Sequence, residues 1–351
     1  MLFLRSRSLP LICLLMLAAT GCDKVQQAID EQTGETAESV DPATPPAAPA
    51  EMAPAATAKT PQQIIDAFLA VPSHERTDAR LQELTALEEG LEQVTELNLA
   101  NSSVTDAGFA GVKNLTALKT ANLSQTRLSN AAFAALTELT QLEELTLDGM
   151  VNVDGAALET IKEVESLRSL KMTNTVIGDV ALVSLAELPH LELLHIDGVR
   201  NMAGRPFADA AKKGGFKELR ELSFSGTQFG TYGLENVGSL KSLEVIRAQG
   251  GEINDGTFLT IGACTNLREL YFQNNSFNPN SLKALQRLRN LEVLRLDGCN
   301  SIVDPSFDML KSLKGLRELG LEGCPCTPAA VEQLKTKFLK ETAIHYGGET
   351  L

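Results

Sequence analysis

The sequence predicts an α/β solenoid, a stack of short units that each supply one strand and one short helix. Three observations predict it. An apolar pattern returns about every 24 residues, its first half alternates apolar and polar residues, and its second half places apolar residues three apart. A period of this length indicates a solenoid, alternation indicates a strand, and steps of three indicate a short helix.

The strand half of the pattern occurs in ten copies. In the ninth copy its apolar residues are Leu291, Leu294 and Leu296. Successive copies start 24, 24, 25, 24, 28, 24, 24, 24 and 25 residues apart. One strand per copy, paired in parallel with the next at about 4.8 Å, would form a sheet on the concave side of a curved stack. The copies start at Val94, Leu118, Leu142, Leu167, Leu191, Leu219, Leu243, Leu267, Leu291 and Leu316.

The helical half of the pattern predicts short α- or 3₁₀-helices with one buried stripe. In the first copy the stripe is Phe109, Val112 and Leu115. An acidic or amide residue precedes the stripe in several copies, and such side chains are preferred helix N-caps. We expect the N-caps to be Asp106, Asn130, Asp179, Asp255 and Asp304.

These copies resemble the short class of leucine-rich repeat, which reads LxxLxLxxT, then a turn, then an aspartate before the helix. The resemblance covers residues 77–346 and rests on ten copies. It implies an α/β leucine-rich repeat solenoid, with a curved parallel sheet on the concave face and short helices on the convex face. The fold serves many functions, so the resemblance alone does not assign one.

The first residues resemble a bacterial lipoprotein signal peptide. Arg5 and Arg7 precede an apolar run too short for a confident membrane span, and Ala19-Thr20-Gly21 precede Cys22. We expect residues 1–21 to be a signal peptide and Cys22 to carry the lipid. The alternative is an ordinary secretory signal with an incidental cysteine.

The remaining chain divides by composition. Residues 22–59 are rich in Pro, Ala, Thr and Glu and predict a disordered tether. Residues 60–93 predict a helical N-terminal cap, which starts with a capping box at Thr60 and Gln63. The ten repeats occupy 94–326, and 327–351 predict a C-terminal cap made of a last helix and a closing strand. The interval of 28 predicts extra residues around Asn201 and in Lys212–Gly215, on the turn and the helical side.

Composition and spacing argue against several functions. The net charge of −14 argues against nucleic acid and against electrostatic binding to an acidic membrane surface. The four histidines lie in different copies, and no catalytic, metal-ligand or phosphate-loop spacing occurs. We therefore expect a protein without enzymatic activity, cofactor or metal.

Two cysteines occupy a repeated inward position. Cys299 and Cys324 stand three residues after the third apolar residue, where other copies have Ser, Thr or Asn. We expect both to be buried. A disulfide from Cys299 to Cys324 or Cys326 stays open, because neighbouring copies bring these residues close in an oxidising compartment.

The variable residues of the strands predict a binding surface on the concave face. Tyr271 stands between two copies that carry Arg247 and Arg295, and exposed Tyr with Arg is typical of an interaction hot spot. A separate column alternates in charge from Lys119 to Arg317 and predicts a ladder of ion pairs that fixes the register. The candidate partner-binding residues are Lys171, His195, Asp197, Arg247, Tyr271, Arg295 and Asp297.

The leading hypothesis is a non-catalytic interaction or scaffolding module that binds a protein partner through its concave face. The signal peptide places it at the bacterial cell envelope, anchored by lipid and facing the periplasm or the exterior. One alternative is that the Lys/Arg/Tyr/His surface binds an anionic envelope glycan or peptide. Another is a structural spacer without a dedicated ligand. The pattern does not specify the partner, the membrane leaflet or the oligomeric state.

Overall fold

The computed structural model describes residues 59–200 and 202–351. The predicted signal peptide, Cys22, nearly all of the tether, and Asn201 lie outside the described residues.

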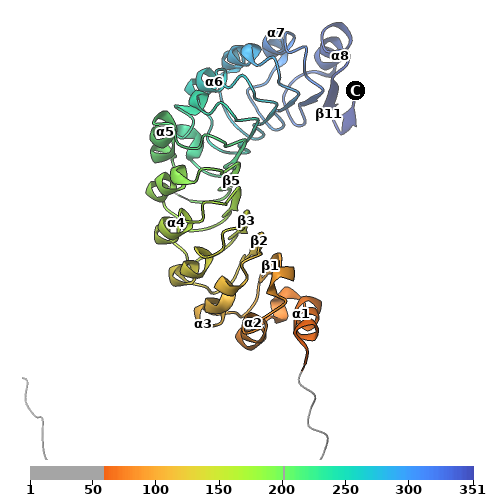
Figure 1. Cartoon of the computed structure of the whole chain (residues 1–351). Coiled ribbons are helices and arrows are strands. Elements are labelled where there is room, and N and C mark those ends of the chain that lie inside the picture. Colours follow the sequence, from red (N-terminus) through yellow and green to blue (C-terminus); the bar gives the residue numbers. More distant parts are fainter. Residues whose placement is uncertain (1–58, 201) are drawn as a thin grey trace, which may run out of the picture. The chain divides into compact units, whose positions relative to one another are not determined.

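Twelve strands of the described residues form a single sheet in sequence order (Figure 1). Strands β1 to β11 pair in parallel, and β12 pairs antiparallel with β11. Equivalent residues of successive copies are partners, as in Leu97 with Ala121 and Leu145 with Leu170. The strands are β1 (Glu96–Asn98), β2 (Thr120–Asn122), β3 (Glu144–Thr146), β4 (Ser169–Lys171), β5 (Leu193–His195), β6 (Glu221–Ser223), β7 (Val245–Arg247), β8 (Glu269–Tyr271), β9 (Val293–Arg295), β10 (Glu318–Gly320), β11 (Ala343–Tyr346) and β12 (Glu349–Thr350).

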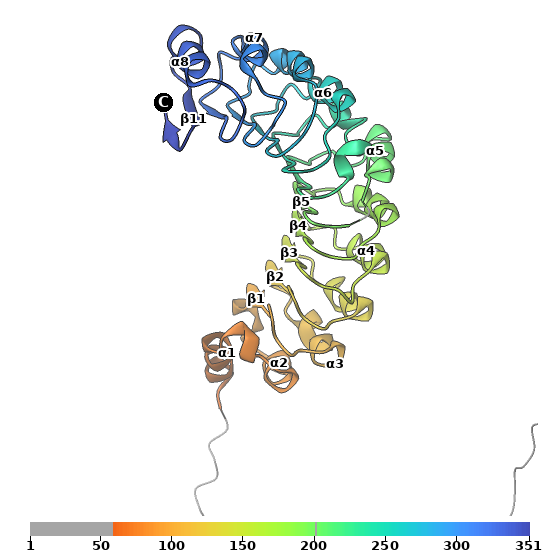
Figure 2. The same cartoon turned by 180° about the vertical axis from the view of Figure 1, so that it is seen from behind.

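In the described residues the strands line the inner side of the curve and the helices lie on the outer side (Figures 1 and 2). The α-helices are α1 (Pro61–Ala70), α2 (Asp78–Thr85), α3 (Asp106–Phe109), α4 (Gly155–Ile161), α5 (Arg205–Lys212), α6 (Asp255–Ile261), α7 (Phe307–Leu310) and α8 (Pro328–Lys337). The 3₁₀-helices are η1 (Ser73–Glu75), η2 (Leu91–Gln93), η3 (Ala110–Asn114), η4 (Asn130–Leu136), η5 (Asp179–Glu187), η6 (Phe229–Thr231), η7 (Val237–Ser239), η8 (Pro279–Arg287) and η9 (Asp304–Ser306).

The apolar residues of the repeat form one continuous core. Leu145, Leu194 and Leu294 are at most 1% exposed, and the helical residues Phe109 and Leu182 are fully buried. A single copy could not bury both its strand and its helix, so each copy uses its neighbours to do so. The predicted solenoid is confirmed.

Every copy turns away from its strand at a residue with positive φ. This residue stands two positions after the third apolar residue of the copy, and it is Gly, Asn or Gln. Glycine adopts this left-handed conformation without a Cβ clash, and Asn tolerates it. The turn residues are Asn101, Gln125, Gly149, Asn174, Gly198, Gly226, Gly250, Asn274, Gly298 and Gly323.

The predicted N-caps at the repeat helices were wrong by one residue. Asp106 is the first residue of α3, and Thr105 before it is the N-cap. The Asp106 carboxylate instead accepts hydrogen bonds from Ser129 of the next copy, 2.8 Å from its backbone N and 2.5 Å from its Oγ. Asp304 binds Thr327 in the same way, at 2.7 and 2.8 Å. These side chains therefore join neighbouring copies rather than cap their own helix.

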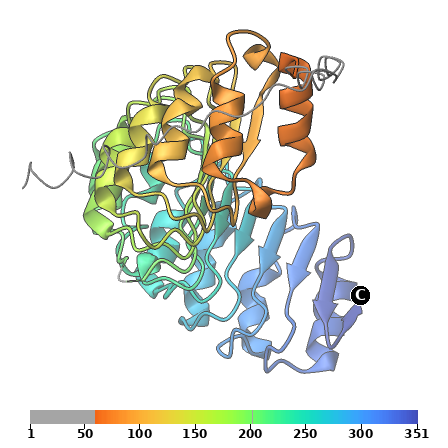
Figure 3. The same cartoon turned by 90° about the horizontal axis from the view of Figure 1, so that it is seen from below.

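Helices α1 and α2 lie at the start of the stack (Figure 3, orange). The predicted capping box of α1 is present: the Gln63 backbone N donates to Thr60 Oγ1, and the Thr60 N donates to Gln63 Oε1. Arg76 is only 6% exposed and connects this region to β1 through a 2.5 Å hydrogen bond from Nη1 to the Asn98 carbonyl. The first strand thus has a buried polar partner beyond its sheet edge.

The other end of the stack contains more structure than predicted (Figure 3, blue). The expected last helix and closing strand are α8 and β11. The antiparallel strand β12 was not predicted. Gly347 and Gly348, at φ +64° and +81°, form the turn that folds the chain back onto β11. The Gly347-Gly348 dipeptide is a typical two-residue hairpin turn, and the sequence analysis did not use this signal.

Candidate functional site

The concave face presents three columns of side chains. In each repeat strand the middle residue is buried, and the residues before and after it are outward-facing with a few exceptions, such as the buried Ser223. The residue before the middle one belongs to the first column, the residue after it to the second column, and the residue two positions further on to the third column. In β7 these residues are Val245, Arg247 and Gln249. The candidate residues came from the second and third columns only.

The second-column candidates lie side by side on neighbouring strands. Lys171 on β4 is the partner of His195 on β5, and Tyr271 on β8 lies between Arg247 and Arg295. Only Ser223 separates His195 from Arg247 along this column. The structure therefore brings together the basic and aromatic residues that the sequence selected.

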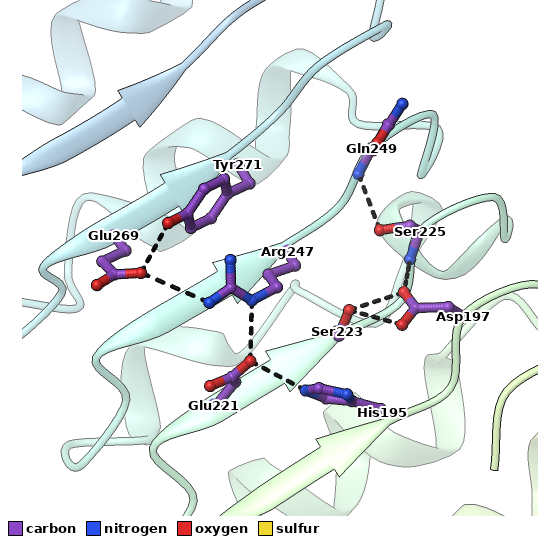
Figure 4. Close-up of polar contacts among 9 residues, drawn as sticks. All are labelled: His195, Asp197, Glu221, Ser223, Ser225, Arg247, Gln249, Glu269 and Tyr271. Carbon is purple, nitrogen blue, oxygen red and sulfur yellow. Dashed lines mark hydrogen bonds and ion pairs between the residues drawn. The ribbon is translucent and has the colours of Figure 1, made fainter. Parts of the chain in front are cut away.

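The first column supplies carboxylates that the sequence analysis missed. Glu221 Oε1 lies 3.0 Å from His195 Nε2 and 2.9 Å from Arg247 Nε (Figure 4). The hydrogen bond from His195 and the ion pair with Arg247 lower the pKa of Glu221 to about 2, although burial acts in the opposite direction. Glu221 therefore stays ionised and holds the His195 ring and the Arg247 guanidinium of the candidate site.

Arg247 continues this network toward Tyr271. Its guanidinium lies over the Tyr271 ring, 4.2 Å from the centroid, and its Nη2 is 3.6 Å from Glu269. The Tyr271 hydroxyl donates a 2.9 Å hydrogen bond to the same Glu269 carboxylate (Figure 4). Burial raises the pKa of Tyr271, which keeps the hydroxyl protonated as a donor. Arg247 and Tyr271, residue types typical of interaction hot spots, are thus held in place by contacts within the protein.

Arg295 is held in a second cluster. Its Nε is 2.8 Å from Asp297, and its Nη1 is 2.6 Å from Glu318. His345 Nε2 lies 3.4 Å from the same Glu318. Both arginines of the candidate site are therefore ion-paired within the protein.

The two candidate aspartates also have a structural role. Asp297 Oδ1 accepts a 2.9 Å hydrogen bond from the backbone N of Glu322 in the next copy. Asp197 accepts from Ser223 Oγ at 2.7 Å and from the backbone N of Ser225 (Figure 4). These bonds satisfy backbone donors at the turn of each next copy, so the aspartates stabilise the stack as well as facing the solvent.

The concave face is acidic overall. Nine carboxylates and three permanent cations lie in the three columns of β1 to β10, which leaves a formal charge of −6. The cations are Lys171, Arg247 and Arg295; the carboxylates are Glu96, Glu144, Asp148, Asp197, Glu221, Glu269, Asp297, Glu318 and Glu322. Reading only two of the three columns overstated the basic character of this face.

No protein-family model matches the sequence, and no curated protein matches it. Solved structures do. An internalin (inlF) from Listeria monocytogenes is 16% identical, with 81% of this chain and 93% of that chain covered and a TM-score of 0.53. The chain in the TLR13–ssRNA13 complex is 20% identical, with 76% and 44% covered and a TM-score of 0.50. This chain thus spans less than half of the TLR13 chain.

The similarity to these structures agrees with the ten in-register parallel strands. The chain has the leucine-rich repeat fold. In this fold each copy of the sequence pattern is one turn of the solenoid, and the three columns are the outward positions of its sheet.

The charge ladder along one rim of this leucine-rich repeat sheet is present in most copies. Ion pairs join Arg168 to Glu192 at 2.5 Å and Arg268 to Glu292 at 2.7 Å. Five of the eight neighbouring pairs between Lys119 and Arg317 are within ion-pair distance. These side chains are partly or largely exposed, so each pair contributes only a few tenths of a kcal/mol.

Cys299 and Cys324 are buried at the repeated inward position, three residues after the third apolar residue, as expected. Cys299 is fully buried and its Sγ donates to the Phe272 carbonyl at 3.2 Å; Cys324 Sγ donates to the Leu296 carbonyl at 3.1 Å. Both bonds reach the previous copy, as does the bond from Asn275 Nδ2 to the Ala248 carbonyl, whereas Thr126 bonds to the Leu123 carbonyl of its own copy. The cysteines are free thiols in the described part of the chain. Burial raises the pKa of Cys299 to about 11 and that of Cys324 to about 12, so neither is a reactive thiolate.

The long repeat contains a hollow on the helical side. It has a volume of about 940 Å³ between η5 and the segment from α5 to Lys217. Val183 and Ala186 line one wall, and Arg205 and Asp209 line the other. Gly214, at φ +92°, provides the turn after α5 where the extra residues were expected.

Residues 59–200 and 202–351 contain neither a metal-binding group of side chains nor a membrane-spanning helix. No group of three His, Cys, Asp or Glu side chains there could hold a metal ion. Among the helices of these residues, none has the length and apolar character needed to cross a bilayer.

Proposed function

We propose that this protein is a non-catalytic recognition module that binds a protein partner through the concave sheet. The observation that carries the proposal is the network from His195 through Glu221, Arg247 and Glu269 to Tyr271. It holds an aromatic ring and a guanidinium on an outward surface in fixed positions, which reduces the side-chain entropy lost on binding. The proposed contact surface consists of Lys171, His195, Asp197, Arg247, Tyr271, Arg295 and Asp297.

A basic glycan-binding surface has less support than a protein-binding one. An anionic glycan would need a local excess of cations, but Arg247 and Arg295 each lie between two carboxylates. The face also has a formal charge of −6, with nine carboxylates and three cations. The same charge argues against a nucleic-acid ligand of the kind named for the TLR13 complex.

The predicted location belongs to the same proposal. Lipid on Cys22 and a tether over residues 22–59 would hold the solenoid at a bacterial envelope membrane, with residues 60–93 and 327–351 as its caps. Labelling cells with radioactive palmitate tests the anchor. The native protein should be labelled and sediment with membranes, whereas Cys22→Ala should be unlabelled; labelling of Cys22→Ala would contradict the proposed anchor.

A matched pair of variants tests the binding surface. Arg205 lies over Tyr232 on the helical side at 4.2 Å, the same contact as Arg247 over Tyr271. Partner recovery in a pull-down should be lost with Arg247→Ala/Tyr271→Ala and kept with Arg205→Ala/Tyr232→Ala. Equal recovery with both double variants would contradict the assignment of the concave face.

A further inference from the structure

The first column alternates acidic and aliphatic side chains over the last six strands of the repeat sheet. In strand order it reads Leu193, Glu221, Val245, Glu269, Val293 and Glu318. Direct partners in the sheet are Glu221 with Val245, Val245 with Glu269, Glu269 with Val293 and Val293 with Glu318. A carboxylate therefore occurs on every second strand, with a valine between.

The carboxylates are accessible as well as paired. The side chains of Glu221, Glu269 and Glu318 are 22%, 34% and 35% exposed. Each carboxylate has about four lone-pair sites. Each also has two internal partners, an arginine together with His195, Tyr271 or His345, which leaves sites for a further donor. Val245 and Val293 are half-buried and face the same side. The column is thus a stripe of acceptors separated by apolar steps.

The spacing of this stripe matches one polypeptide conformation. Strands two apart in a sheet are separated by about 9.6 Å. A polyproline II helix has three residues per turn and rises about 3.1 Å per residue, so every third side chain lies on one face about 9.3 Å apart. A regular extended strand does not fit as well, because residues three apart point to opposite sides.

From this geometry we infer the chemistry of the partner. The first column binds a basic polyproline II segment that crosses the strands, with a cationic side chain at every third residue. Its cations meet Glu221, Glu269 and Glu318, and its intervening prolines or aliphatic residues pack on Val245 and Val293. This inference rests on the proposed function of the concave face and specifies what that face recognises.

The test uses the full-length protein in a non-ionic detergent and acetylated, amidated 12-residue peptides, measured by calorimetry. The probe is (Arg-Pro-Pro)₄. One control peptide has the same composition with its four arginines consecutive, and a second is (Glu-Pro-Pro)₄. The probe should bind at least threefold more tightly than the clustered peptide, and the acidic peptide should not bind. Equal affinity for the two basic peptides, or binding of the acidic one, overturns the inference.

Two variants with the same change in charge locate the site. The concave variant replaces Glu221, Glu269 and Glu318 by Gln. The rim variant replaces Glu192, Glu244 and Glu292 by Gln, whose side chains are 34%, 34% and 26% exposed in the ion-pair ladder. The concave variant should weaken binding about tenfold, as the loss of three partly exposed pairs predicts, and the rim variant less than twofold. Equal weakening would mean that net charge alone attracts the peptide, and the inference would fall.

A third variant covers the case in which the concave variant does not fold, as judged by circular dichroism. Val245→Lys/Val293→Lys keeps all three carboxylates and places cations between them, so it should abolish binding of (Arg-Pro-Pro)₄. Unchanged affinity overturns the inference. The proposed function is judged separately, by partner recovery with Arg247→Ala/Tyr271→Ala. If that recovery is lost while the peptides show no dependence on Glu221, the concave face binds a partner of different chemistry.

Discussion

Glu221 illustrates what the sequence shows and does not show at the scale of single residues. It stands in the strand pattern at a position that varies between copies, and only the register of three strands reveals that it contacts both His195 and Arg247. Those residues are 26 positions away on either side in the chain. The exposed face of the sheet was predictable, but the pairing across it required the first column to be considered as well.

The pKa of Glu221 gives a prediction about stability. Its pKa in the folded protein, about 2, is below the ordinary 4.5, so its contribution is complete above about pH 4.5 and is lost as the pH falls toward 2. Glu221→Gln should lower the free energy of unfolding by about 1–2 kcal/mol at pH 7. Urea unfolding should show this deficit shrinking between pH 4.5 and 3. As a control, Glu143→Gln changes an exposed rim carboxylate and should have little effect at any pH. A deficit for Glu221→Gln that is constant with pH would contradict the assignment.

The buried cysteines give a prediction about reactivity. Cys264, Cys299 and Cys324, with pKa values of about 11 to 12, should react with a thiol reagent at pH 8 only when the protein unfolds. The exposed Ser276→Cys should react within minutes as a control. Mass spectrometry of the labelled peptides identifies the modified sites. A disulfide between Cys299 and Cys324, or labelling of either in the native protein, would contradict their assignment as buried, unreactive thiols.

At the scale of elements, the alternating and three-residue periods predicted strands and short helices in the right order. The boundaries of the helices were less predictable. An aspartate before an apolar stripe normally indicates an N-cap, yet Asp106 is one residue inside α3 and binds Ser129 of the next copy. Local sequence rules do not include a neighbour 23 residues away, and stacking supplies that neighbour.

This link between copies can be measured with a double-mutant cycle. Asp106→Ala and Ser129→Ala should each destabilise the protein by about 1–2 kcal/mol, and together by clearly less than their sum, because both remove the hydrogen bond from Ser129 Oγ to the Asp106 carboxylate. Asp106→Ala combined with Thr137→Ala should be additive, since Thr137 bonds only within its own copy. Additivity for the first pair in equilibrium unfolding would show that Asp106 does not join the two copies.

At the scale of the folded unit, the repeat determines where function can lie. Leucines of successive copies bury one another, which leaves the three columns of the sheet and the outer helices as surfaces. The fold was predictable because ten copies average out the ambiguity of any single strand. The repeat pattern predicts neither the closing hairpin nor the hollow beside α5, because each arises once, in a segment that departs from the repeat. For the hairpin, the local signal was the Gly347-Gly348 turn.

The central claim is that the concave sheet, rather than the helical side, meets the partner. Site-specific photo-crosslinking in cells tests it most directly, with benzoylphenylalanine placed either at Gln249 in the third column or at Lys283 in η8; both side chains are exposed. Gln249 should give a crosslinked partner that Lys283 does not. A partner captured from Lys283 alone, or from neither position, would contradict the account.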